Sequence, residues 1–205
     1  MAVKLASIFF TMILVDNYVL AKFLGICPFL GVSKKLDSAV GMSRAVTFVM
    51  VMATAATWPI YKFFLSPDWA VRTARDLGYL QTIVFILIIA ILVQLLENFL
   101  KKFIPALYKA LGVYLPLITT NCTILGVTIL NLDNGYNFIE SIVCAAGAGI
   151  GFLVAMVLFS GVRRRVEQAI VPECFKGLPI TLVAAAMTSL SFMGFGGIVT
   201  AIFGV

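Results

Sequence analysis

The stretch that decides the fold lies at Cys27–Ser33 and reads CPFLGVS, and a second copy at Cys122–Thr128 reads CTILGVT. Both copies have the form Cys-x-x-Leu-Gly-Val-[Ser/Thr], and their cysteines lie 95 positions apart (122 minus 27). An internal repeat of this kind indicates two related halves. Each copy interrupts an apolar run with a cysteine and turn-forming residues. The repeat therefore predicts two halves, each of which presents a thiol at a break between helices.

The composition around these motifs is that of a membrane protein. Of the 205 residues, 62% are hydrophobic and only 12% are charged, whereas soluble domains carry about a quarter charged residues. Several apolar runs reach the roughly 20 residues that a helix needs to cross a bilayer. Histidine is absent, which excludes histidine-based acid–base catalysis and histidine ligation of metals or haem. No zinc spacing or Gly-rich phosphate loop is present, so we do not expect this chain to be a catalyst on its own.

The apolar runs predict an all-α integral membrane fold with six transmembrane helices. The first run, from about Leu5 to Val32, is too long for one straight helix, and we expect a break near Gly25–Cys27. The fourth run is also too long, and Pro116 with Thr119–Cys122 marks its break. The six predicted spans are Leu5–Val32, Ala39–Phe64, Tyr79–Phe99, Ile104–Leu132, Phe138–Val162 and Leu178–Phe203. Residues 1–205 are expected to form a single membrane domain.

The distribution of basic residues predicts the orientation in the membrane. Six spans place both termini on the same side. Ten basic residues fall on one side, in or near the loops between spans one and two, three and four, and five and six: Lys34, Lys35, Arg44, Lys101, Lys102, Lys109, Arg163, Arg164, Arg165 and Lys176. The other side has four: Lys4, Lys62, Arg72 and Arg75. Because basic residues gather on the cytoplasmic side, we expect both termini to be extracytoplasmic.

The repeat also predicts how the halves are related. Three spans per half (about 1–102 and 103–205) invert the second half relative to the first. Inverted repeats with broken helices place a site near the bilayer midplane. We therefore expect Cys27 and Cys122 to approach each other from opposite sides of the membrane.

The sequence around the two cysteines favours a metal or cluster site. Pro28 suits the first position of a helix, which would make Cys27 the N-cap of the second half-helix, with Asn121 and Cys122 in the equivalent place. Helix N-termini favour negative charge, such as a thiolate. The alternatives are that both cysteines only fill helix contacts, or that they form a disulfide. Two thiolates are half of the four that an iron–sulfur cluster usually takes, so a second protein would have to complete the site.

Other polar residues have weaker functional signals. Asp16 and Lys22 lie in the first span, where ionisable residues are functional candidates. A local ion pair of Asp16 and snorkelling of Lys22 toward the membrane surface are equally good interpretations. Cys144, in the fifth span, and Cys174, in a loop, are interpreted as structural or incidental. We expect Glu97 and Lys101 to form a helical ion pair. Small residues in the fifth span should allow close helix packing: Gly147, Gly149 and Gly151. The run Arg163–Arg165 is expected to anchor the topology.

Three stretches resemble a known family. Phe23–Lys35, Leu115–Cys122 and Ser191–Phe195 are similar to segments of the RnfA family, the A subunits of Rnf ion-translocating electron transport complexes, and the likeness covers essentially the whole chain. The E subunit of the sodium-translocating NADH:quinone reductase is a related alternative, although the Cys-Pro-Phe-Leu-Gly form is closer to the Rnf protein.

The resemblance implies a role as well as a fold. It implies a component of a translocase in the bacterial cytoplasmic membrane that moves electrons between ferredoxin and NAD, coupled to transport of Na+ or H+. It implies a homologous partner of opposite topology, the E subunit of the Rnf complex. It also implies a [2Fe-2S] cluster shared between the two, with Cys27 and Cys122 as this chain's ligands. From the residues alone, a secondary transporter with inverted repeats and a metal-free scaffold remain alternatives.

Overall fold

The computed structural model describes residues 2–33, 36–62, 78–103, 118 and 121–194. These residues form seven α-helices and one short 3-10 helix, and no strand occurs among them. The helices are α1 (Ala2–Leu14), α2 (Ile26–Val32), α3 (Leu36–Ile60), α5 (Gly78–Phe103), α8 (Cys122–Asp133), α9 (Phe138–Glu167) and α10 (Leu178–Met193), with the 3-10 helix η2 at Glu173–Phe175. The prediction of an all-helical protein is confirmed.

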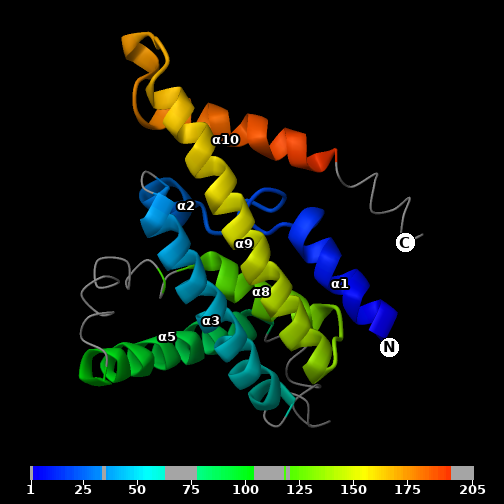
Figure 1. Ribbon diagram of the computed structural model, residues 1–205. Coiled ribbons are helices and arrows are strands. Elements are labelled where there is room, and N and C mark those ends of the chain that lie inside the picture. The colour runs from blue at the N-terminus through cyan, green and yellow to red at the C-terminus, as the bar shows by residue number, and fades with distance from the viewer. Residues whose placement is uncertain (1, 34–35, 63–77, 104–117, 119–120, 195–205) are drawn as a thin grey trace.

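Helix α9 is the central element of the fold, with α1 and α3 packed along it (Figure 1). The predicted role of its small residues in close packing is confirmed. A β-carbon added at Gly149 would lie 2.4 Å from Thr47 Cγ2 of α3. One added at Gly151 would lie 3.0 Å from the Met12 carbonyl oxygen of α1. Small residues at these points let neighbouring helices approach closely, as in membrane helix packing.

The first span is broken as predicted, but the break is longer and lies earlier. Helix α1 ends at Leu14 and α2 begins at Ile26, so Asp16 and Lys22 lie in the non-helical connection and not within a helix. Asn17 organises this connection. Its side chain is buried; the amide nitrogen donates to the Gly151 carbonyl at 2.8 Å, and Oδ1 accepts from the Val19 N–H at 3.1 Å. The wider break is held by these Asn17 bonds together with backbone hydrogen bonds from Ala21 N–H to the Asn17 carbonyl and from Leu24 N–H to the Tyr18 carbonyl.

The other predicted spans correspond to helices with shifted ends. Helix α9 runs on to Glu167, beyond the expected end at Val162, and α5 starts close to the expected Tyr79. Helix α8 begins at Cys122, as the predicted break requires. The first part of the fourth span, the end of the last span and the Glu97 and Lys101 side chains lie outside the described residues.

Contacts between helix ends show which ends share a face of the molecule. Lys4 of α1 pairs with Glu140, in the first turn of α9, at 2.8 Å. Trp58, near the end of α3, donates to the Tyr136 carbonyl just before α9 at 3.1 Å. The start of α1, the end of α3 and the start of α9 therefore lie together, which is the alternation that the predicted topology requires.

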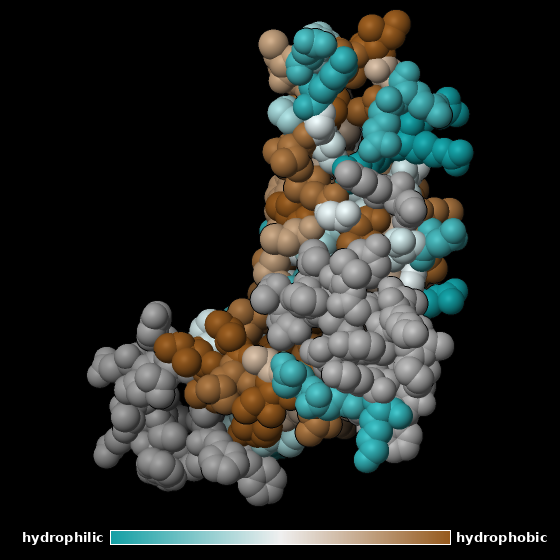
Figure 2. Space-filling model, turned by 90° about the vertical axis from the view of Figure 1, so that its left-hand side faces the viewer, coloured by the Kyte–Doolittle hydropathy of each residue, from teal (hydrophilic) through white to brown (hydrophobic). Residues whose placement is uncertain are grey.

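Two helices of the described part, α3 and α9, are long and apolar enough to cross a membrane, and four shorter apolar helical segments accompany them. Helices α5 and α10 run across the direction of α3 and α9 in Figure 1. Both expose large apolar side chains, among them Ile83, Leu87, Ile91 and Leu95 of α5 and Met187, Leu190 and Met193 of α10. In Figure 2, apolar side chains cover the middle of the tall part, and polar ones gather near its upper end and along one edge. This surface fits a helical membrane protein, while six crossings and an inverted repeat stay predictions.

Candidate functional site

The residues just before Cys27 meet the second cysteine motif in the folded chain. The backbone N–H of Gly25, two residues before Cys27, donates to the Sγ atom of Cys122 at 2.9 Å. These residues lie 97 positions apart in the sequence. One hydrogen bond thus connects the start of α2 to the thiol at the start of α8.

Two glycines allow this contact, one from each side. Gly25 has φ +85°, in the left-handed region, and a β-carbon there would lie 2.2 Å from Thr123 Oγ1 and 3.2 Å from Asn121 Oδ1. A β-carbon at Gly126, in the second motif, would lie 2.6 Å from Leu24 Cδ1. Glycine is the residue that tolerates both this backbone conformation and this proximity. Gly25 lies at the predicted break and Gly126 in the second motif, but the packing of each against the other segment is a tertiary contact that has no local signal in the sequence.

Helix α2 begins earlier than predicted, and α8 begins where the prediction placed it. Gly25, not Cys27, is the N-cap of α2, which makes Cys27 the second and Pro28 the third helical residue. The placement of Cys27 at the N-cap was therefore wrong, because the left-handed glycine starts the helix earlier. Asn121 is the N-cap of α8, as expected, and its Oδ1 accepts the Thr123 N–H at 3.1 Å. Both thiols lie in a first helical turn, where backbone N–H groups lack helical partners.

The exposure and hydrogen bonding of Cys27 and Cys122 suit metal or cluster ligands whose site is completed by a partner protein. Cys27 is exposed, Cys122 is partly buried, and both are free thiols, as are Cys144 and Cys174. Among the described residues no group of three or more His, Cys, Asp or Glu side chains comes together. Two thiols beside free helix N-termini, one of them already accepting an N–H, match half of a four-thiolate donor set.

Two polar atoms beside Cys122 are buried without a partner. Asn121 and Thr123 are 4% and 0% exposed, and neither Asn121 Nδ2 nor Thr123 Oγ1 has a hydrogen-bond partner. An unsatisfied buried polar group costs about 1–3 kcal/mol, so such atoms in a native fold require an explanation. A group bound to the neighbouring thiols would supply acceptors for both.

The remaining candidates lie apart from this junction. Cys144 is fully buried in α9, and Cys174 is exposed in η2; their interpretation as structural or incidental stays a prediction. The Lys22 side chain is exposed, with its Nζ 5.1 Å from the centre of the Tyr18 ring. Asp16 and Lys22 form no ion pair with each other in the described part of the chain.

Arg163 has a role that the sequence analysis missed. It is 8% exposed, its Nη1 donates to the Leu30 carbonyl and to Ser33 Oγ (2.8 Å for the latter), and its Nε lies 3.3 Å from Glu167 Oε1. A cation at a helix C-terminus offsets the negative end of the helix dipole. Arg163 thus secures the end of α2 from α9, while Phe29 stacks on Phe159 at 4.1 Å between ring centres. No local pattern distinguishes Arg163 from Arg164 and Arg165, since the difference is a tertiary contact.

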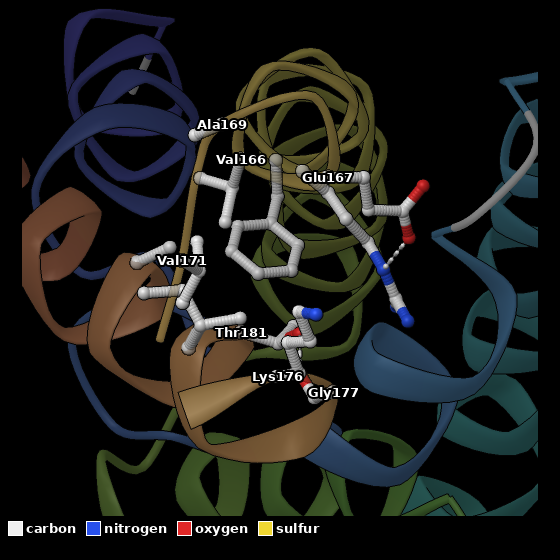
Figure 3. A pocket seen from close by; sticks show the side chains of 11 residues that line it. Val166, Glu167, Ala169, Val171, Lys176, Gly177 and Thr181 are labelled. Atoms are coloured by element: carbon white, nitrogen blue, oxygen red, sulfur yellow. Dashed lines mark hydrogen bonds and ion pairs between the residues drawn. The ribbon is translucent and has the colours of Figure 1, made fainter. Parts of the chain in front are cut away.

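A cavity of about 280 Å³ lies on the other side of Arg163, between the end of α9 and the start of α10 (Figure 3). Its lining is mostly apolar, including Val166, Val171 and Ile180, with Arg163, Glu167 and Lys176 as the charged members. Neither cysteine of the repeated motif lines it. The cavity and the thiol junction are therefore separate features.

The chain matches a protein-family model described as "Rnf-Nqr subunit, membrane protein" over residues 5–199. The chain belongs to the Rnf-Nqr family. It is 54% identical over 193 residues to the A subunit of the Na(+)-translocating ferredoxin:NAD(+) oxidoreductase complex of Acetobacterium woodii, covering 94% of this chain and 97% of that protein. It is 51% and 52% identical, over 187 residues each, to the A subunits of the ion-translocating oxidoreductase complexes of Syntrophotalea carbinolica and Serratia proteamaculans, covering 91% of this chain and 93% of each relative. The resemblance stated from the motifs is confirmed.

Proposed function

We propose that this chain is the A subunit of an ion-translocating ferredoxin:NAD+ oxidoreductase complex in the bacterial cytoplasmic membrane. The support is its membership of the Rnf-Nqr family and its identity of about half or more to proteins that are named as A subunits, across nearly their whole length. Those names favour this assignment over the E subunit of the sodium-translocating NADH:quinone reductase. The chain acts as one part of a translocase that couples electron transfer to movement of Na+ or H+.

Within that complex, we propose that Cys27 and Cys122 provide half of the ligands of an intramembrane [2Fe-2S] cluster. The observation that carries the proposal is the hydrogen bond from Gly25 N–H to Cys122 Sγ, which connects the helix start that carries Cys27 to the second cysteine. The E subunit of the Rnf complex, a homologue of opposite topology, provides the other two ligands. When bound, the cluster accepts and releases single electrons.

Residues of this chain place hydrogen-bond donors around Cys27 and Cys122. The Gly25 N–H donates to Cys122 Sγ at 2.9 Å, and it would donate in the same way to this sulfur as a cluster ligand. The first turns of α2 and α8 add their unpaired N–H groups. Arg163 holds the far end of α2 to α9, which fixes the position of Cys27.

The proposed topology has six spans in a 3+3 inverted repeat, about 1–102 and 103–205, with both termini outside the cytoplasm. The excess of basic residues around three loops supports this orientation. The pairing of Lys4 with Glu140, and of Trp58 with the Tyr136 carbonyl, supports the alternating direction of the first, second and fifth spans.

The test is electron paramagnetic resonance with iron and acid-labile sulfide analysis on the purified complex carrying Cys27→Ser or Cys122→Ser. We expect each variant to lose the same iron–sulfur signal and the corresponding iron while the complex still assembles. Cys144→Ser and Cys174→Ser are matched controls and should retain the signal. An unchanged signal in the Cys27 and Cys122 variants would remove these residues from the ligand set.

A further inference from the structure

The two unpartnered polar groups beside Cys122 stand out against the other buried hydroxyls. Five buried serines and threonines in the described helices donate to a backbone carbonyl three or four residues earlier: Ser43 to Ala39, Thr54 to Met50, Thr57 to Ala53, Thr128 to Leu125 and Thr181 to Gly177. Thr123 is fully buried, yet its Oγ1 has no such partner. Its hydroxyl is thus a free donor within a buried part of the molecule.

The position of Thr123 in α8 explains why the usual partner is missing. Helix α8 begins at Cys122, so Thr123 is the second residue of the helix and no carbonyl of α8 lies four positions before it. The hydroxyl instead faces the other motif, since a β-carbon at Gly25 would lie 2.2 Å from Oγ1. The donor is therefore directed at the turn that leads into Cys27.

Asn121 presents a second donor at the same place. Its Oδ1 accepts a hydrogen bond from the Thr123 N–H at 3.1 Å, and this bond caps α8. The remaining Nδ2 group is buried without a partner, and Oδ1 lies 3.2 Å from the position of a β-carbon at Gly25. The two unpartnered groups, Asn121 Nδ2 and Thr123 Oγ1, therefore flank Cys122 in the sequence, and the side-chain oxygens of Asn121 and Thr123 lie beside Gly25 in space.

We infer that Asn121 Nδ2 and Thr123 Oγ1 are positioning donors that hydrogen-bond the sulfur atoms of the group held by Cys27 and Cys122, and that they raise its reduction potential. This inference rests on the proposed function. Hydrogen bonds to the sulfurs are among the factors that set the potential of an iron–sulfur centre. Donors stabilise the more negative, reduced state, so their removal lowers the potential.

The test is a redox titration of the purified complex followed by electron paramagnetic resonance. Thr123→Val removes the hydroxyl and keeps the shape of the side chain, while Asn121→Ser keeps a capping oxygen, removes the amide donor and adds no charge. We expect both variants to retain iron and sulfide and to shift the midpoint potential to more negative values. Thr123→Ser restores a donor and should return the midpoint toward that of the unmodified complex. Thr128→Val, in the same helix with a hydroxyl bound to the Leu125 carbonyl, is the control and should leave the midpoint unchanged.

Two outcomes would overturn the inference. One is a midpoint that stays at the original value in both Thr123→Val and Asn121→Ser. The other is loss of iron and sulfide from both, which would make the pair necessary for building the site and not for setting its potential. Failure of the ligand assignment itself is distinguishable, because it would appear as an unchanged signal in the Cys27→Ser and Cys122→Ser variants.

Discussion

Helices α2 and α8 each begin next to a cysteine motif, but they begin in different ways. Helix α2 starts at Gly25, whose left-handed backbone replaces a side-chain cap. Helix α8 starts at Asn121, whose side chain caps the Thr123 N–H. The repeated sequence thus places both thiols in a first helical turn, Cys27 as the second helical residue and Cys122 as the first, with two different helix starts.

The difference follows from how the two motifs fit together. Gly25 supplies a backbone N–H to Cys122, and this approach leaves no room for a side chain. Asn121 and Thr123 supply the side chains that occupy the space beside Gly25. One motif therefore contributes backbone and the other contributes side chains, so we expect equivalent substitutions in the two copies to have unequal effects.

The largest effect is expected for Gly25→Ala. The change forces a non-glycine residue to φ +85° and places its β-carbon 2.2 Å from Thr123 Oγ1. Backbone strain and overpacking together predict a loss of about 2–5 kcal/mol of stability. The measurement is the thermal unfolding temperature of the purified complex. The control is Gly41→Ala, because nothing lies within 4 Å of a β-carbon at Gly41; equal transitions in the two variants would contradict the packing described here.

A smaller effect is expected for Arg163→Met, which acts on the other end of α2. The substitution leaves the Leu30 carbonyl and the Ser33 hydroxyl without their buried donor, at a cost of about 1–3 kcal/mol. Arg164→Met is the matched control, since Arg164 is exposed and belongs to the same basic run. If Arg163 served only to anchor the topology, both variants would lower the unfolding temperature equally.

The sequence predicted the features of the site that depend on local pattern. The repeated motif indicated that Cys27 and Cys122 share a role, and the break predicted from Pro116 and Thr119–Cys122 agrees with the start of α8 at Cys122. Proline after Cys27 was a misleading signal for the start of α2. The helix begins at Ile26 because Gly25 adopts a conformation set by contacts with Asn121 and Thr123.

The features that the sequence could not predict depend on residues far apart in the chain. Asn17, which lies within the first break, donates a hydrogen bond to the Gly151 carbonyl of α9, 134 positions away. Arg163 holds α2 through a bond to Leu30, 133 positions away. Neither partner has a distinctive local pattern, so the extent of the break and the buried arginine emerge only from tertiary packing.

The smallest of these effects is expected for Gly126→Ala, in the second motif. A β-carbon there would lie 2.6 Å from Leu24 Cδ1, but Gly126 is helical and the Leu24 side chain is able to move. Overpacking alone predicts a loss of about 1–2 kcal/mol, less than at Gly25. The measurement is a double-mutant cycle with Leu24→Ala, using the unfolding temperature of the complex. Because Leu24→Ala removes the opposing atoms, Gly126→Ala should add little further loss in that background, and residues in contact are expected to depart from additivity in this way. Strict additivity would mean that the two motifs do not touch at this point, and the asymmetry between the two helix starts would then rest on Gly25 alone.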